Sequence, residues 1–277
     1  NQTIEYYFFH IKILFFIINL FPRLKKYSWK IWYNFISSKF KNDDFKFMNY
    51  GYFKKDFNPD LNSLDEKERF PIHLYHHVST QISLKGLKVL EVGSGRGGGA
   101  SYIARYLMPN SITGIDISSK AINLCNDSYN IENLNFVIGD SENIPFKDNY
   151  FDAVINIESS HCYPSLSNFI NEVSRVLKPG GHFLYCDLII AKNLEIQLKE
   201  LSNNSLKLIN HTDITQNIIK ASELMTNDRL SIIGSIKSPF LKRVLGSFAS
   251  VKGSKIYNSF VNRHYLYISA LSQKNIN

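Results

Sequence analysis

An acidic residue and a set of closely spaced glycines stand together in the first third of the chain, where Glu91 precedes a Gly-x-Gly-x-x-Gly spacing over residues 93–98. The apolar residues 88–92 predict a strand, and a helix is expected from about Ser101. Glycines in such a turn let the backbone approach a ligand, and the helix start offers unpaired N–H groups. The glycine spacing by itself also occurs in dinucleotide-binding enzymes.

Glu91 distinguishes between the two possible ligands, a dinucleotide and S-adenosylmethionine. A pyrophosphate would be repelled by a carboxylate two residues before the first glycine. A ligand with a cationic amino group, such as the methionine end of S-adenosylmethionine, would be attracted. The alternative is a glycine turn of an ordinary α/β protein with Glu91 solvated at its edge. The sequence therefore favours S-adenosylmethionine over a dinucleotide.

Two further carboxylates follow the next predicted strands. Asp116 ends the strand expected over 111–116, about 20 residues past the glycine turn, where a carboxylate accepts ribose hydroxyls. Asp140 follows the strand expected over 134–137, where it can take the exocyclic amine of adenine. Ligands of parallel sheets bind at the carboxyl ends of strands, which brings both groups to one edge. Alternatively, Asp116 is an acid that stabilises a helix N-terminus, and Asp140 is an ordinary turn residue.

His161 and Asp187 are the candidate catalytic residues. His161 lies in the segment 156–164, which follows the fourth predicted strand and should face the transferable group. With an ordinary pKa near 6.5 it would be largely neutral at working pH and could act as a general base. Asp187, at the end of the fifth strand, could orient His161 or bind a substrate hydroxyl. A buried structural histidine is the alternative, and Cys162 is disfavoured as a nucleophile because adjacent residues seldom face each other productively.

The elements around these residues alternate as strand and helix from Leu87 onward, which predicts an α/β, doubly wound, mostly parallel seven-stranded sheet. The expected strands are 89–92, 111–116, 134–137, 153–157, 182–188, 206–213 and 264–272. The expected helices are 71–82, 99–106, 119–126, 167–176, 214–224 and most of 239–260. Residues 178–181 read as a tight turn. An N-terminal helical extension and a helical cap insertion over about 192–260 complete the expected fold.

Composition sets limits on the function. The 277 residues suit one sizeable domain over 46–277 after an extension over 1–45. Three cysteines without metal-ligand spacing indicate neither a disulfide framework nor a zinc site, so no metal is expected and a reducing, cytoplasmic compartment is the default. The net charge of +8 allows attraction to anions, but much of it lies in residues 23–46, which argues against nucleic acid as a partner.

The start of the chain is strongly apolar. Residues 6–21 are nearly all aromatic or aliphatic, and basic residues follow at once. As a helix rising about 1.5 Å per residue, this run barely reaches the thickness of a bilayer core. The pattern predicts membrane association through residues 6–30. The alternative is a helix packed against its own domain. A cleaved signal peptide fits poorly, because no small-residue cleavage site follows the apolar run.

Four motifs, over residues 90–102, 139–146, 158–164 and 175–181, give the chain a family resemblance. The sequence resembles class I S-adenosylmethionine-dependent methyltransferases and, within them, is similar to the phthiotriol/phenolphthiotriol dimycocerosate group of lipid and polyketide O-methyltransferases. The resemblance, over about 25–275, implies cofactor contacts at Glu91, Gly93, Gly95, Asp116, Asp140 and Ser141. Ser94, Ile117, Glu142 and Asn156, near these positions in the sequence, are further expected cofactor contacts. The family's aromatic lid over the cofactor would correspond to Tyr50 and Tyr52, with core packing as the alternative.

These observations favour transfer of a methyl group from S-adenosylmethionine to a hydroxyl of a hydrophobic small molecule by in-line displacement. Segments 45–82 and 192–260 would build the acceptor pocket, and their aromatic and aliphatic content suits a lipid, polyketide or terpenoid. N- or C-methylation of a sterol, phospho-base or other small metabolite is the alternative. An inactive, membrane-tethered protein that only binds the cofactor is a second alternative, and the oligomeric state stays open.

Overall fold

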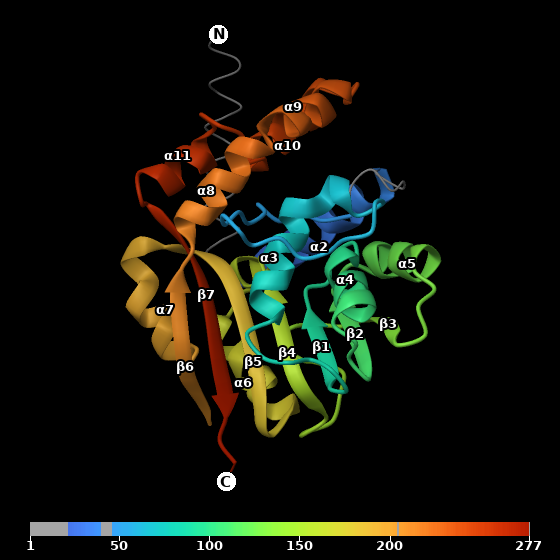
Figure 1. Ribbon diagram of the computed structural model, residues 1–277, viewed down its shortest axis with the longest axis vertical. Helices are drawn as coiled ribbons and strands as arrows, with labels where there is room; N and C mark the ends of the chain where they lie inside the picture. Colours follow the sequence, from blue (N-terminus) through green and yellow to red (C-terminus); the bar gives the residue numbers. More distant parts are fainter. Residues whose placement is uncertain (1–21, 40–45, 204, 277) are drawn as a thin grey trace.

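A twisted sheet of seven strands runs through the centre of the computed structural model, which describes residues 22–39, 46–203 and 205–276. The strand order is β3-β2-β1-β4-β5-β7-β6. β7 runs antiparallel to both β5 and β6, and the other pairs are parallel. The expected doubly wound sheet is therefore confirmed (Figure 1). The apolar run 6–21 lies outside the described residues.

The strands occupy nearly the predicted positions. Their bounds are β1 Lys88–Val92, β2 Ser111–Asp116, β3 Leu134–Ile138, β4 Phe151–Ile157, β5 Leu177–Ile190, β6 Leu206–Asp213 and β7 Tyr265–Lys274. β1 is buried on both faces, which explains its unbroken apolar run apart from Glu91. Strand order reverses between β1 and β4, so the carboxyl ends of these two strands border the crevice where such sheets bind ligands.

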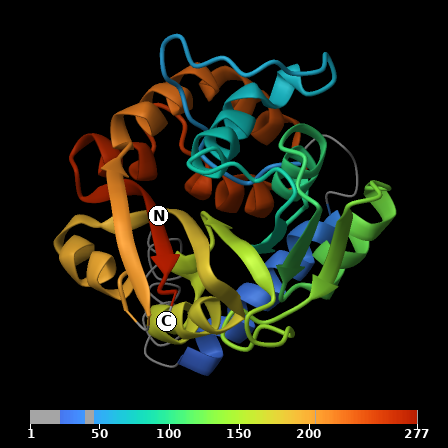
Figure 2. The same cartoon turned by 60° about the horizontal axis from the view of Figure 1, so that its bottom comes forward.

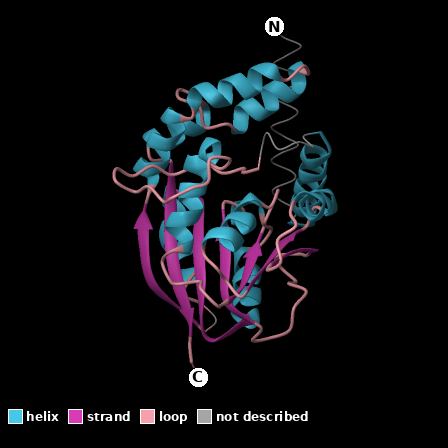
Figure 3. Cartoon of the chain, turned by 45° about the vertical axis from the view of Figure 1, so that its right-hand side comes forward, coloured by secondary structure: helices cyan, strands magenta, loops and turns pink. Residues whose placement is uncertain are grey.

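Helices cover both faces of the sheet (Figures 1 and 2). α3 Arg69–Ser79, α4 Gly98–Tyr106 and α5 Ser119–Ser128 pack on one face, and α6 Leu166–Val176 and α7 Leu194–Glu200 pack on the other. Four more helices lie beyond the carboxyl ends of the parallel strands (Figure 3), namely α8 Thr215–Leu224, α9 Thr226–Ser235, α10 Pro239–Phe248 and α11 Lys255–Val261. α2 Pro22–Lys39 is the N-terminal helix.

The structure corrects three local expectations. Residues 178–181 are not a separate turn but the first part of β5, where the register with β4 shifts. Gly180 has φ +76° there, a conformation that favours glycine and bends the strand without ending it. The segment 239–260, expected to be mostly helix, is divided into the two helices α10 and α11. α7 and α9 were not predicted, because neither short segment has a strong apolar period.

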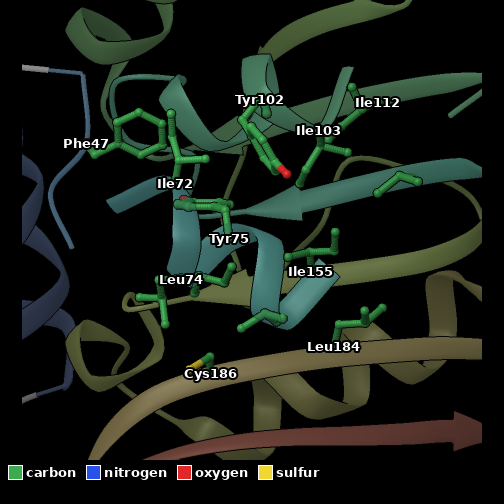
Figure 4. Close-up of a cluster of buried hydrophobic side chains, with 14 of the residues drawn as sticks. Phe47, Ile72, Leu74, Tyr75, Tyr102, Ile103, Ile112, Ile155, Leu184 and Cys186 are labelled. Atoms are coloured by element: carbon green, nitrogen blue, oxygen red, sulfur yellow. The ribbon is translucent and has the colours of Figure 1, made fainter. Parts of the chain in front are cut away.

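The larger of two main apolar clusters joins α3 and α4 to the sheet. Ile72 and Tyr75 of α3 and Ile103 of α4 belong to the same buried cluster as Ile155 of β4 (Figure 4), and each of these side chains is at least nine-tenths buried. A second cluster lies under α6 and includes Phe169 on the opposite face. The two clusters hold the strands in a fixed register, so the loops at their carboxyl ends start from rigid positions. In the described part of the chain, no helix combines the length and apolar character needed to cross a bilayer.

Candidate active site

The turn after β1 is fixed by its own backbone. The N–H groups of Gly93 and Ser94 both donate to the Ile115 carbonyl, at 2.8 and 3.0 Å. Gly93 has φ +79°, and a Cβ at that position would lie 2.4 Å from Ser159 Oγ. Only glycine fits there, because a side chain would collide with the loop after β4.

This turn borders a cleft that encloses about 940 Å³, its open mouth included. Seven of the predicted cofactor contacts line it: Gly93, Ser94, Gly95, Asp116, Ile117, Asp140 and Ser141. Five others do not line it: Glu91, Glu142, Asn156, Tyr50 and Tyr52. The strand-end residues therefore converge as expected, whereas several of their neighbours support the cleft from behind.

Glu91 lies directly behind the cleft wall and is 1% exposed. The Tyr75 hydroxyl, which lines the cleft, donates to Glu91 Oε1 at 2.7 Å. The Tyr75 ring is held against Gly99, where a Cβ would come within 1.9 Å of it. Glu91 Oε2 is buried with no hydrogen-bond partner. Burial raises the pKa of Glu91 to about 8, so a cationic group in the cleft would restore its charge.

Asp116, at the end of β2, ties three segments together. Its Oδ2 accepts the Gly95 N–H at 3.0 Å, and its Oδ1 accepts the Ser118 N–H at 2.8 Å. Ser118 in turn caps α5, because its hydroxyl accepts the Ala121 N–H at 3.1 Å. Burial raises the pKa of Asp116 to about 6 despite these bonds. The carboxylate is therefore positioned in the cleft as a rigid hydrogen-bond acceptor.

Asp140 and Glu142 follow β3, and both carboxylates interact with the same lysine side chain. Lys26 of α2 contacts the Asp140 carboxylate, and its Nζ lies 3.3 Å from Glu142 Oε2. Glu142 Oε1 accepts the Ser165 N–H at 3.0 Å, so it anchors the start of α6. Asp140 thus faces the cleft already paired with a lysine, which the sequence did not indicate.

The loop after β4 is built on a buried polar network. Asn156 is fully buried, and its Nδ2 donates to the Val92 carbonyl at 2.9 Å and to Ser159 Oγ at 2.7 Å. Ser159 Oγ also lies 2.9 Å from the Tyr163 hydroxyl. Asn156 therefore joins the ends of β1 and β4, while Ser159 and Tyr163 line the cleft.

His161 and Asp187 form the pair that the sequence predicted. His161 Nδ1 lies 2.8 Å from Asp187 Oδ1, and Asp187 is fully buried. The neutral ring would then carry its proton on Nδ1 and leave Nε2 as the acceptor. Burial lowers the pKa of His161, but Cys162 and the Asp187 carboxylate outweigh it and raise the pKa well above 6.5. Both groups therefore favour the charged form of the ring over the neutral form expected from the sequence.

His161 stands at the edge of the cleft rather than in its lining. Its side chain is 32% exposed, while Cys162, Tyr163 and Pro164 directly after it line the cleft. Lys25 of α2 donates to the carbonyls of His161, at 3.1 Å, and Tyr163, at 2.7 Å. The helix α2 thereby fixes the backbone of this loop.

The predicted lid tyrosines pack behind the lid segment instead of facing the cleft. The Tyr50 ring meets Phe260 edge-on at 5.7 Å, and Tyr52 stacks on His77 with ring centroids 4.4 Å apart. The cleft is lined instead by the residues just before them, Lys46, Phe47, Met48 and Asn49. The aromatic content of the sequence predicted the correct lid segment, but it could not show which side chains of that segment point into the cleft.

Sequence reasoning missed the contribution of α2. Trp29 and Tyr33 line the cleft together with Lys26, whereas Ile31 and Phe35 of the same helix are 53% and 37% exposed. The i, i+4 spacing of Trp29 and Tyr33 was the available signal, since it places both rings on one side of the helix.

Comparison with known proteins agrees with this geometry. The methyltransferase domain family matches residues 90–185. The chain is 36% identical over 235 residues to the phthiotriol/phenolphthiotriol dimycocerosates methyltransferase of Mycobacterium leprae, covering 83% of this chain and 86% of that protein. It is 38% identical over 214 residues to the fatty-acid O-methyltransferase of Mycolicibacterium smegmatis, covering 77% and 78%. The chain belongs to the class I S-adenosylmethionine-dependent methyltransferases.

Solved structures confirm the fold of this methyltransferase. Geranyl diphosphate C-methyltransferase from Streptomyces coelicolor, in complex with S-adenosyl-L-homocysteine, superimposes with a TM-score of 0.62 at 16% identity, covering 87% of this chain and 98% of that one. The cofactor of the methyltransferase is S-adenosylmethionine. The site suits it, because Glu91 holds a buried oxygen without a partner and the glycines of the turn line the cleft.

The Lys26 contact leads to a first prediction. If Asp140 binds the adenine amine, the lysine must give up this carboxylate, and Lys26→Ala should tighten cofactor binding. The two side chains are 28% and 30% exposed, so the gain is limited to about 1 kcal/mol, or about fivefold in Kd. Calorimetric titration with S-adenosylmethionine measures it. Lys30→Ala, on the same helix but outside the cleft lining, should change little, and weaker binding by Lys26→Ala would contradict the prediction.

Proposed function

We propose that this protein transfers the methyl group of S-adenosylmethionine to an oxygen atom of a lipid-like acceptor. The observation that carries the proposal is the His161–Asp187 pair in the loop after β4, next to residues that line the cleft. A histidine held by a buried carboxylate can take the proton of a hydroxyl, which N- and C-methylation need less. The relatives named for phthiotriol and for fatty acid support a lipid-like acceptor.

The cofactor residues have distinct proposed roles. Glu91 would receive the amino group, Asp116 the ribose hydroxyls, and Asp140 the adenine amine, while Ser141 and Ile117 contact the base from the same edge of the sheet. When bound, S-adenosylmethionine supplies an activated methyl group on a sulfonium. The remaining task of the chain is to hold the acceptor oxygen in line and to remove its proton, and such alignment can supply about 7–11 kcal/mol of barrier reduction.

Glu91 should couple cofactor binding to pH. Its carboxyl is protonated in the empty cleft at neutral pH, because its pKa is about 8. A bound ammonium favours the carboxylate, so binding should release a proton and tighten as pH rises, by up to about tenfold per pH unit below 8.

Glu91→Gln tests this coupling. Calorimetry in buffers of different ionisation enthalpy should show proton release for the unaltered protein and none for the variant, whose affinity should be lower. Glu195→Gln, an exposed change on α7, should behave like the unaltered protein. If Glu91→Gln released as many protons on cofactor binding as the unaltered protein, Glu91 would not be the group that couples binding to pH.

The acceptor chemistry can be tested directly. The protein is incubated with methyl-labelled cofactor and dodecanol, dodecanoic acid or a lipid extract of its source cells, and the products are identified by mass spectrometry. A methyl ether supports a hydroxyl acceptor. A methyl ester supports the second candidate, a carboxyl acceptor, which the 38% identity to a fatty-acid O-methyltransferase favours. Cofactor binding without any transfer would instead support an inactive protein.

The pair itself predicts the pH profile. Only neutral His161 can accept a proton, and its pKa lies well above 6.5, so kcat/KM should rise with pH on the alkaline side of 6.5. Asp187→Asn removes the charge that raises this pKa and should shift the rise to lower pH. His161→Ala should lower kcat by about 10²–10⁴.

Two results would count against the His161–Asp187 pair. One is a His161→Ala variant with nearly full turnover, and the other is a pH profile that Asp187→Asn leaves unchanged. The exposed His211→Ala on β6 is the control and should keep both turnover and pH profile.

We also propose that the protein docks on an anionic membrane surface, from which a lipid acceptor can enter. Leu24, Tyr27, Ile31 and Phe35 share one outward face of α2 and are 48%, 64%, 53% and 37% exposed. The basic charge of residues 23–46 follows the apolar segment 6–21 in sequence. An apolar stripe with cationic neighbours binds anionic bilayers.

Replacing both Tyr27 and Ile31 by Glu tests the membrane proposal. The double variant should lose most sedimentation with phosphatidylserine-containing vesicles, since it puts negative charge on the stripe, while cofactor binding persists. Leu64→Glu, a change at an 82% exposed site away from α2, is the matched control. If the double variant binds the vesicles as well as the unaltered protein does, this face of α2 is not the membrane-binding surface.

A further inference from the structure

Asn34 joins the N-terminal helix α2 to the start of α5. It comes directly after Tyr33, which lines the cleft, and α2 lies against α5. The side-chain oxygen Oδ1 of Asn34 accepts the Ser118 hydroxyl at 2.8 Å and the Lys120 N–H at 3.2 Å. Both bonds use the amide oxygen, so Asn34 acts at this position as a hydrogen-bond acceptor.

These two bonds complete the N-terminus of α5. The first N–H groups of a helix have no acceptor within the helix. The Ser118 hydroxyl accepts the Ala121 N–H at 3.1 Å, and Asn34 supplies the acceptor for the Lys120 N–H from another helix. A hydroxyl has one proton, so donating it to Asn34 leaves the Ser118 lone pairs for Ala121. Asn34 therefore fixes the orientation of Ser118, which is itself fully buried.

Ser118 connects this helix start to the cleft. Its N–H donates to Asp116 Oδ1 at 2.8 Å, while the Gly95 N–H donates to Asp116 Oδ2 at 3.0 Å. The carboxylate is thus held on one side by the glycine turn and on the other by the segment that Asn34 holds. Asp116 lines the cleft, and a carboxylate has about four acceptor sites, so it can accept ribose hydroxyls besides these backbone bonds.

We propose that Asn34 is a positioning residue for the cofactor ribose, because by holding Ser118 it fixes the direction in which Asp116 receives the ribose hydroxyls. The inference rests on the proposed role of Asp116. It gives α2 a part in cofactor recognition at the ribose, besides the contact of Lys26 with Asp140. Asn34 acts through Asp116, so its loss should weaken only those ligands that carry ribose hydroxyls.

Asn34→Leu is the principal test, since leucine has nearly the same size but no acceptor. Calorimetry measures the binding of S-adenosyl-L-homocysteine and of its dideoxy analogue, which lacks both ribose hydroxyls. The unaltered protein should prefer the ribose form, and Asn34→Leu should lower this preference by about tenfold while the affinity for the analogue stays within about twofold. Equal losses for the two ligands would show a merely structural role and would overturn the proposal, as would an undiminished preference.

A second variant separates the hydrogen bonds of Asn34 from its shape. Asn34→Asp keeps an acceptor for Ser118 and Lys120, and a negative charge is favourable near the start of α5. The variant should therefore fold and keep the preference for the ribose form within about twofold. If its preference instead falls as far as that expected for Asn34→Leu, the acceptor is not what positions Asp116. Asn123→Leu makes the same substitution as the principal test at an exposed position of α5, and as the matched control it should bind both ligands like the unaltered protein.

Asp116→Ala separates this inference from the role proposed for Asp116. It should remove most of the preference for the ribose form. If it does so and Asn34→Leu does not, the inference fails and the proposed role of Asp116 stands. If Asp116→Ala keeps the preference, Asp116 does not receive the ribose and the inference fails with it. These measurements need no methyl acceptor, so a reduced preference in both variants supports the inference even where no methyl transfer is found.

Discussion

The buried carboxylate of Asp187 is the constraint on which the active site depends. A charge removed from water must be compensated by hydrogen bonds. Asp187 is fully buried and accepts the Ser160 hydroxyl at 2.6 Å, the His161 N–H at 3.0 Å and the Leu188 N–H at 2.7 Å, besides pairing with the His161 ring. Breaking any of these bonds would leave part of a charge unsolvated. These bonds hold the loop after β4 in place, and in this loop Glu158 has φ +53°.

The positions of the strand-end residues followed from the sequence, and the positions of residues on α2 and the lid did not. Parallel strands end at one edge, so Asp116, Asp140 and Asp187 had to converge once the alternation of strands and helices was read correctly. The direction of a helix face or a loop side chain depends instead on what packs against it. The spacing places Trp29 on another side of α2 than Ile31, but it does not tell that the side with Trp29 turns inward and the side with Ile31 turns outward.

The two sides of the cleft are connected through the segments that cover it. Arg229 of α9 donates to the Asn49 carbonyl at 3.1 Å, and the next residue, Tyr50, donates to Glu158. Trp29 of α2 meets Phe248 of α10 at 6.4 Å. The cap, the lid segment and the N-terminal helix thus contact one another as well as the sheet. The lid segment thus connects α9 of the cap to Glu158 in the lining of the cleft.

Charge balance explains why so many acids are buried here. Burial raises the pKa of Glu91 and Glu158 to about 8 and that of Asp116 to about 6, so the empty cleft disfavours their ionised forms. A cofactor that carries an ammonium and a sulfonium supplies the missing positive charge and favours ionisation of the same groups. Methyl transfer removes the sulfonium charge, which again disfavours a carboxylate beside the reacting atoms.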